Sequence, residues 1–353
     1  MATEKFANIG GVWKAVSSEY ANIGGVWKNA TTNYANIGGA WKPVPIVGAL
    51  LFVPETTTRF YQLDTTAGAD NWHENTVGSI AVACDSDGNS YWANGTDVTK
   101  CDTDGNVDWT FTGHTSTVTS VCVDADGDVY SGDAGGTVKR ILSSGNQEWS
   151  QNLGVNYSVY GLAVDYSASI IYASTGNAEF EVHRLLKVNG NHARIYYSPI
   201  EADILTIAID ESASLYLGFA DIGIVRKISN AGYVYPTFTE DMDGASGSVT
   251  QVVVGHDGYG YAALKDTKAI RKFDLSDGSE VWIETIGGTA AGAGVAVDTL
   301  GNVYGAFRKA GNSVDNQIRS VNSSGNTRWN WSPYVSAQFY KMAVTPGLKS
   351  AGF

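Results

Sequence analysis

The sequence is poor in cysteine, proline, histidine and basic residues. Its 353 residues include 3 Cys, 7 Pro, 5 His and 23 Lys plus Arg, against 36 Asp plus Glu. The formal net charge of −13 argues against nucleic-acid partners and anionic membrane surfaces, because both are bound through clustered lysine and arginine. Cys84, Cys101 and Cys122 have no metal-ligand spacing, so we expect buried, reduced thiols.

Long hydrophobic runs are also missing. The longest apolar stretch, Ile46 to Val53, is too short to span a bilayer, so membrane insertion is not expected. The first residues, MATEKFANIG, lack the apolar segment of a signal peptide. We therefore expect synthesis in the cytosol without Sec-dependent export.

Glycine and aromatic residues are abundant, with 41 Gly, 19 Tyr and 10 Trp. Within 119–149, four short strand-like runs are separated by turns rich in Gly, Asp, Asn and Ser. Such a pattern is typical of a four-stranded antiparallel meander. One sheet of this size cannot cover both of its faces, so it needs neighbouring copies.

The first strand of this unit recurs along the chain at intervals of 39 to 47 residues. Its copies are Val82-Ala83-Cys84, Val121-Cys122-Val123, Leu162-Ala163-Val164, Ile207-Ala208-Ile209, Val252-Val253-Val254, Val295-Ala296-Val297 and Met342-Ala343-Val344. In six units a tyrosine opens the second strand: Tyr91, Tyr130, Tyr172, Tyr216, Tyr261 and Tyr304. Seven four-stranded units at a period near 40 predict an all-β, seven-bladed β-propeller.

A second marker closes most units, a glycine followed four residues later by tryptophan. The pairs are Gly68/Trp72, Gly105/Trp109, Gly145/Trp149, Gly278/Trp282 and Gly325/Trp329. Two units keep the glycine, Gly190 and Gly232, but carry Arg194 and Pro236 in place of tryptophan. We expect these tryptophans to pack between blades.

The two ends of the repeat region complete one another. The last unit supplies one strand, around Tyr340 to Thr345, and the first supplies three, at 50–53, 59–63 and 71–73. One plus three makes a composite seventh blade that closes the ring and removes its open edges. We place the propeller at 49–353 and a proline-containing linker at 43–48, because Pro43 and Pro45 should block strand continuation.

Residues 1–42 hold a different repeat, (F/Y)ANIGG(V/A)WK, in three copies with a period of 14. Gly-Gly between two apolar runs predicts a two-residue hairpin, with Ile9 facing Val12 and Asn8 facing Trp13. The three hairpins could form one six-stranded meander that caps the protein, or each could dock on a separate partner surface. A lone hairpin is marginal, so we expect a partner surface from the propeller, from a second copy of the chain or from a larger assembly.

This repeat resembles the short tandem hairpins at the ends of bacteriophage tail and tail-fibre-type proteins. The resemblance implies a virion component that attaches to other virion proteins through residues 1–42. The aromatic positions are the candidate anchoring residues: Phe6, Trp13, Tyr20, Trp27, Tyr34 and Trp41.

Individual blades resemble three repeat families. Gly113-His114 with Asp126-Gly127 is similar to WD repeats, although the closing Trp-Asp is missing. The Gly-x-x-x-Trp endings resemble the tryptophan-docking blades of quinoproteins, and Asp298 to Tyr304 resembles NHL-type repeats. These resemblances support the fold and leave the function open.

Several residues are candidates for chemical sites. Asp-rich turns at 85–89, 102–106 and 124–128 suit tight hairpins better than calcium, because no distal glutamate completes an EF-hand loop. No two histidines have metal-ligand spacing, and His114 is expected to brace its loop. We therefore expect no metal and no cofactor. Exposed tyrosines could stack on sugars, the candidates being Tyr157, Tyr160, Tyr166, Tyr196 and Tyr197.

No P-loop, zincin or Gly-x-Ser-x-Gly motif is present. The sequence thus predicts a non-enzymatic virion protein, whose repeats attach it to the particle. Its propeller is expected to serve host attachment, through a host surface glycan or protein, or to decorate the particle. Two alternatives stay open: a polysaccharide-degrading propeller enzyme, with two carboxylates at the channel mouth, and a cellular protein–protein scaffold.

Overall fold

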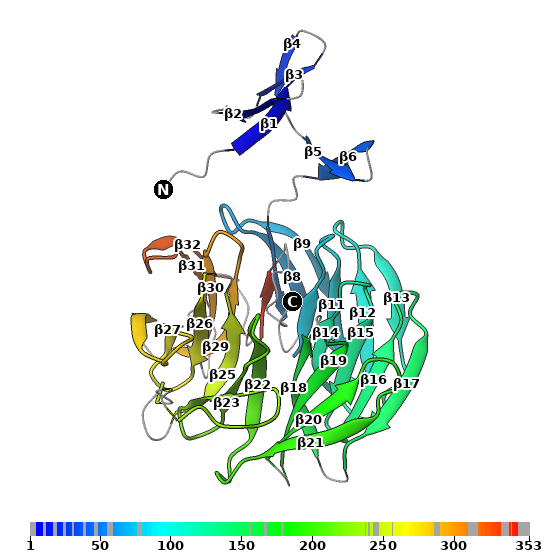
Figure 1. The fold of residues 1–353 in the computed structure, drawn as a ribbon, viewed down its shortest axis with the longest axis vertical. Coiled ribbons are helices and arrows are strands. Elements are labelled where there is room, and N and C mark those ends of the chain that lie inside the picture. Colours follow the sequence, from blue (N-terminus) through cyan, green and yellow to red (C-terminus); the bar gives the residue numbers. More distant parts are fainter. Residues whose placement is uncertain are drawn as a thin grey trace. The chain divides into compact units, whose positions relative to one another are not determined.

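A computed structural model shows the fold of the chain (Figure 1). It describes residues 49–344, apart from 55–58, 76–79, 155–156, 166–167, 178–179, 237, 239–240, 243–246, 256, 286–289, 310–316, 333–338 and 340, and the backbone of six strands within 1–48. The chain divides into two compact units, 1–48 and 49–353. Within the described residues, no helix is long and apolar enough to cross a membrane.

The first unit contains three separate two-stranded sheets. They pair β1 (Lys5–Ile9) with β2 (Val12–Val16), β3 (Tyr20–Ile23) with β4 (Val26–Asn29), and β5 (Thr32–Ile37) with β6 (Ala40–Pro45). The register is the one that the Gly-Gly turns predict, with Asn8 opposite Trp13 and Ile9 opposite Val12. The described strands thus form individual hairpins and no six-stranded meander.

The predicted linker begins inside the third hairpin, because β6 continues through Pro43 and Pro45. These two residues pair with Tyr34 and Thr32 and are two positions apart. Alternate positions of a strand direct their N atoms to the same edge. Because β6 stays paired with β5 at both prolines, which have no N–H to donate, that edge is the one without a partner strand. The prolines therefore end sheet growth at that edge without ending the strand.

The second unit is a ring of seven sheets (Figure 1). Its first three blades, each from the channel outward, are β10 (Val82–Cys84), β11 (Ser90–Asn94), β12 (Asp97–Cys101) and β13 (Val107–Phe111); β14 (Val118–Val123), β15 (Val129–Asp133), β16 (Thr137–Ile141) and β17 (Gln147–Asn152); and β18 (Ser158–Asp165), β19 (Ile170–Gly176), β20 (Glu181–Leu186) and β21 (His192–Tyr197). The next three are β22 (Ile204–Ile209), β23 (Leu215–Phe219) and β24 (Val225–Ile228); β25 (Val249–Val254), β26 (Tyr259–Leu264), β27 (Ala269–Asp274) and β28 (Glu280–Thr285); and β29 (Ala290–Val297), β30 (Val303–Lys309), β31 (Gln317–Val321) and β32 (Thr327–Trp331).

The seventh blade is built from both ends of the propeller, as the sequence predicts. It consists of β33 (Ala343–Val344), β7 (Leu50–Pro54), β8 (Arg59–Asp64) and β9 (Asp70–Asn75). Ala343 pairs with Phe52 and Val344 with Leu51, in antiparallel register. The seven-bladed propeller is confirmed.

One blade departs from the four-stranded pattern. Among the described residues, the sheet of β22–β24 has three strands, and its outer side is completed only by single bridges from Val234 to Ile228 and from Asp241 to Ile224. Pro236 lies in this outer segment. A proline cannot donate to a ladder, which accounts for an irregular segment where the other blades have a fourth strand.

Burial decreases outward along each blade. The second strands β15 and β23 are buried at every residue, whereas the fourth strands β13 and β32 have no buried residue. Neighbouring blades cover both faces of each first strand, and the sequences of these strands are therefore nearly continuous apolar runs. All three cysteines are buried free thiols, as predicted.

The Asp-rich turns are structural. Asp124 Oδ1 accepts the backbone N–H groups of Asp126 and Asp128, both at 3.0 Å, and its Oδ2 accepts the Tyr130 hydroxyl at 3.0 Å. Burial and then the Asp124 charge raise the pKa of Tyr130. The same carboxylate–phenol bond joins Asp85 to Tyr91, Asp210 to Tyr216, Asp257 to Tyr261 and Asp298 to Tyr304.

The tryptophans of the fourth strands dock on the next blade, as predicted. The Trp149 indole N–H donates to the Lys187 carbonyl at 2.8 Å, and a Cβ on Gly190 would lie 2.7 Å from the Trp149 ring. Gly190 has φ +71°, so glycine meets both the steric and the backbone requirement. Equivalent bonds run from Trp72 to Thr103, Trp109 to Ser143, Trp282 to Ser323 and Trp329 to Thr65.

Where tryptophan is lost, other groups take its place. Leu275 lies three residues before Gly278, and its carbonyl accepts the Lys227 ammonium at 2.7 Å and the Tyr216 hydroxyl at 3.1 Å. At the other such junction, a Cβ on Gly232 would lie 1.9 Å from the Ile195 carbonyl oxygen, so backbone packs where an indole would.

Replacing Trp149 with alanine tests the docking. We expect a loss of about 3–5 kcal/mol in the free energy of unfolding, because a buried ring and its hydrogen bond are removed together. Trp149→Phe keeps a ring and should lose only about 1 kcal/mol, the value of one hydrogen bond. Urea unfolding followed by fluorescence measures both. Equal stability of the alanine variant and the parent chain would contradict docking.

Candidate functional site at the channel mouth

The first strands of five blades share a β-bulge at one level of the central channel. The unpaired extra residues are Thr119, Tyr160, Leu205, Thr250 and Ala293. A bulge kinks its strand and redirects a side chain, and bulges are frequent beside functional sites. All five residues line the same cavity, which opens at the channel mouth.

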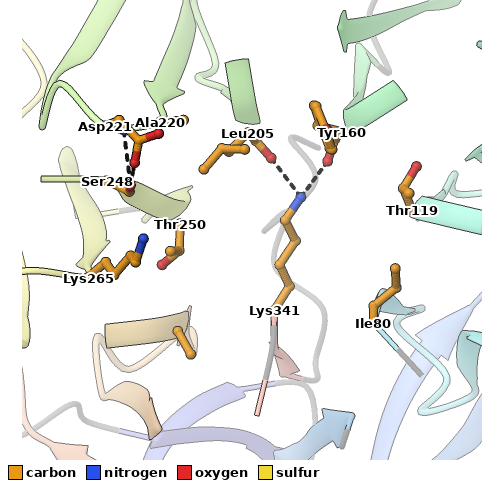
Figure 2. Close-up of a pocket in the computed structure, with 11 residues that line it drawn as sticks. Ile80, Thr119, Tyr160, Leu205, Ala220, Asp221, Ser248, Thr250, Lys265 and Lys341 are labelled. Atoms are coloured by element: carbon orange, nitrogen blue, oxygen red, sulfur yellow. Dashed lines mark hydrogen bonds between the residues drawn. The ribbon is translucent and has the colours of Figure 1, made fainter. Parts of the chain in front are cut away.

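The cavity has a volume of about 380 Å³ (Figure 2). Its polar lining comes from Thr119, Ser248, Thr250 and Tyr160, and its charged lining from Asp221, Lys265 and Lys341. Ile80, Leu205, Ala220 and Ala293 provide apolar wall. Ligand pockets typically have this size and this mixture of apolar wall with a few polar groups.

Lys341 reaches across the channel. It directly precedes Met342 and β33, and its ammonium donates to the carbonyls of Tyr160 at 2.5 Å and Leu205 at 2.8 Å, in two blades on the opposite side (Figure 2). The residue is half-buried and lines the cavity. Burial lowers the pKa of Lys341 to about 8.

Besides Lys341, the cavity lining contains one acidic residue, Asp221, and one basic residue, Lys265. The Ser248 hydroxyl donates to Asp221 Oδ1 at 3.0 Å and accepts the Asp221 backbone N–H at 3.0 Å. Asp221 has φ +56° in the loop between β23 and β24. Lys265 follows β26, and Figure 2 shows its ammonium directed toward the cavity beside Thr250.

A buried glutamine supports the floor of the cavity. Gln251 Oε1 accepts the backbone N–H groups of Val295 and Met342, both at 3.0 Å, and its Nε2 donates to the Met342 carbonyl at 3.1 Å. One side chain thus ties three blades together below Lys341. This network fixes the backbone next to Lys341, because the N–H and the carbonyl of the adjacent Met342 are both hydrogen-bonded to Gln251.

Tyr160 belongs to a polar network on the rim. Its hydroxyl donates to Asn177 Oδ1 at 3.0 Å, and the Asn177 N–H donates to Asp203 Oδ1 at 2.7 Å. Burial and then the Asp203 charge raise the pKa of Tyr160. Of the four described tyrosines proposed as a sugar platform, Tyr160 alone lines this cavity.

The other predicted platform residues do not form one surface. Tyr196 is 6% exposed and accepts a hydrogen bond from Arg226, so the prediction that it is an exposed stacking residue is wrong. Tyr197 is 52% exposed beside Arg194, and Tyr157 packs against the His183 ring. Tyr166 lies outside the described residues.

The predicted anchoring residues are in the other unit. Phe6, Trp13, Tyr20, Trp27, Tyr34 and Trp41 lie on β1 to β6 in that order. Their backbone positions are described, and their side chains lie outside the described part of the structure.

His114 braces its loop, as predicted. Its ring nitrogens bond Asp133 Oδ2 and Ser131 Oγ, both at 2.7 Å, and all three residues are buried. This is a structural arrangement at the entrance to one blade. Across the described part of the chain, no group of three or more His, Cys, Asp or Glu side chains is placed to hold a metal ion.

No protein-family model and no curated protein matches the sequence. The fold, by contrast, matches solved structures. Virginiamycin B lyase from Staphylococcus aureus aligns with TM-score 0.63 at 14% identity, over 73% of this chain and 85% of its own. A streptogramin B lyase aligns with TM-score 0.62 at 14% identity, over 83% and 91%. Raptor from Chaetomium thermophilum aligns with TM-score 0.59 at 11% identity, over 74% of this chain and 25% of its own.

Identities this low establish the propeller fold and no shared activity. The channel-mouth residues were not singled out from the sequence, apart from Tyr160. In four of the five blades the bulged residue precedes the Asp of the turn by five positions, and Thr250 precedes Gly255 by the same spacing, which is a usable signal once the blades are aligned. The sequence signal for Lys341 is a cation directly before an apolar inner strand.

The lowered pKa of Lys341 predicts a pH dependence of stability. Between pH 8 and its ordinary value of 10.5, the unfolded chain binds this proton and the folded chain has lost it. The free energy of unfolding should therefore rise as pH increases across this window. From pH 8 to 9.5 we expect a gain of about 2 kcal/mol relative to Lys341→Met.

Urea unfolding of both chains at several pH values measures this difference. Subtracting the two free energies of unfolding cancels the contribution of the buried tyrosines, because both chains contain them. A difference that stays constant from pH 8 to 9.5 would show that Lys341 keeps an ordinary pKa.

Proposed function

We propose that this chain is a bacteriophage virion protein with a non-enzymatic binding role. Its N-terminal hairpins attach to other particle proteins, and its propeller presents the channel mouth to a host surface glycan or protein. The observation that carries the proposal is the threefold hairpin repeat, described as three separate two-stranded sheets.

The physical argument concerns sheet edges. A two-stranded sheet is at best marginally stable in water, and each of its edges exposes unpaired backbone groups. Three copies with the same register, one in each repeat, offer three equivalent docking elements. Weak sites in tandem bind with high avidity when the partner presents a matching array, as the repeated subunits of a particle do.

An enzyme is the second candidate, and the cavity favours it. A lysine with pKa about 8 is tuned for proton transfer near neutral pH. Virginiamycin B lyase, which shares the fold, is an enzyme, and a variant with one histidine replaced by alanine is catalytically inactive. The described cavity lining of this chain contains Asp221 and Lys341 and no histidine. Polysaccharide cleavage that is lost in Lys341→Met would support the enzyme.

Removing the three repeat tryptophans tests the attachment role. We expect the chain with Trp13→Ala, Trp27→Ala and Trp41→Ala to keep the melting temperature of the propeller and to be missing from particles assembled in its presence. The matched control replaces three fourth-strand tryptophans, Trp109, Trp282 and Trp329, with phenylalanine. It should lower stability and leave incorporation intact.

Immunoblotting of purified particles measures incorporation. A triple-alanine chain that enters particles as well as the parent would contradict attachment through these residues. A chain lacking residues 1–42 extends the test to the whole repeat.

A further inference from the structure

We infer that the channel mouth binds an acidic sugar, a polyhydroxylated ring that carries a carboxylate. The inference rests on the proposed function in one respect, because it specifies the chemistry of a host surface glycan. The site itself is argued from the cavity and would stand if the particle role failed.

The cavity places two cations in a strongly acidic protein. Lys341 and Lys265 both line it, although the chain as a whole has a formal charge of −13. The Lys341 ammonium has three N–H groups, and its bonds to the Tyr160 and Leu205 carbonyls use two of them. No carboxylate among the described residues forms an ion pair with Lys341, which lines the cavity with one N–H unused. A ligand carboxylate supplies the missing charge.

The rest of the lining suits a sugar ring. The Thr119 and Thr250 hydroxyls donate to backbone carbonyls and keep lone pairs that accept hydrogen bonds from sugar hydroxyls. Asp221 Oδ2 likewise accepts hydrogen bonds from a donor. Leu205, Ala220 and Ala293 present apolar surface to the C–H face of a ring. A volume of about 380 Å³ admits a small ligand of one to two sugar rings.

Asp221 distinguishes an acidic sugar from a simple anion. Its carboxylate lies at the mouth and repels an inorganic anion such as phosphate, which has few protons to donate. A sugar instead donates its hydroxyls to Asp221 while its carboxylate lies against the lysines. Phosphate sites also favour bidentate arginine, and the cations that line this cavity are lysines.

Isothermal titration calorimetry of the full chain with glucuronate, glucose and inorganic phosphate tests the inference at low salt. We expect glucuronate to bind at least about tenfold more tightly than either of the others, the value of one charge-assisted hydrogen bond. Lys265→Gln should weaken glucuronate by about tenfold, and Lys341→Met should abolish measurable binding. The matched control, Lys139→Gln, makes the same charge change on β16 outside the cavity and should bind as the parent does.

The pH profile gives a second readout. Among the described residues, the titratable groups that line the cavity besides Lys341 are Tyr160, Asp221 and Lys265. Affinity for glucuronate should be constant from pH 6 to 7.5 and fall by about tenfold by pH 9, as Lys341 loses its proton. Lys265→Gln keeps Lys341 and should show the same profile at lower affinity.

The outcomes separate the two proposals. Equal binding of glucuronate and glucose, equal binding of phosphate, or unchanged binding in Lys265→Gln would each overturn the acidic-sugar site. If the chain enters particles yet binds no glucuronate, the virion role stands and this site is wrong. If it binds glucuronate yet never enters particles, the site stands and the virion role is wrong.

Discussion

The closure of the ring by β33 is the constraint on which the rest of the propeller depends. Two residues, Ala343 and Val344, pair with β7 and so join segments nearly 300 positions apart in sequence. Gln251 bonds the backbone of Met342 on both sides, and Lys341 crosses to the far blades. A strand of two residues is too short to hold by its ladder alone, and these buried polar contacts supply the remainder.

The same closure creates the asymmetry of the channel. Tryptophan docking and Asp–Tyr bonds recur around most of the ring and make neighbouring blades nearly equivalent. If all blades were equivalent, the channel would be lined by uncharged residues such as Thr119 and Leu205. The composite blade breaks it by placing Lys341 where six other blades have uncharged residues. The segment that closes the ring, Lys341 to Val344, therefore also contributes to the candidate site.

Much of this architecture could be predicted from the sequence. Blade number, ring closure, docking and the role of His114 follow from local turn chemistry and from repetition, which a single sequence displays. The spacing from the turn aligns the bulged residues between blades, but it does not show that they are bulged, because a bulge depends on how the inner strands crowd around one axis. Lys341 could not be placed, since its carbonyl acceptors lie 136 and 181 positions away. Tyr196 was misjudged because periodicity says nothing of which tyrosine a neighbouring blade covers.

The chain combines two units, three two-stranded hairpins that we propose attach it to a particle and a closed ring with a polar cavity. Quantitative mass spectrometry of purified phage particles from the source culture tests the proposed virion role most directly. The account predicts this chain at a fixed copy number relative to the major particle proteins, unchanged by high-salt washing. Absence from the particles, or a copy number that varies between preparations, would contradict the virion role and leave the enzyme and scaffold alternatives.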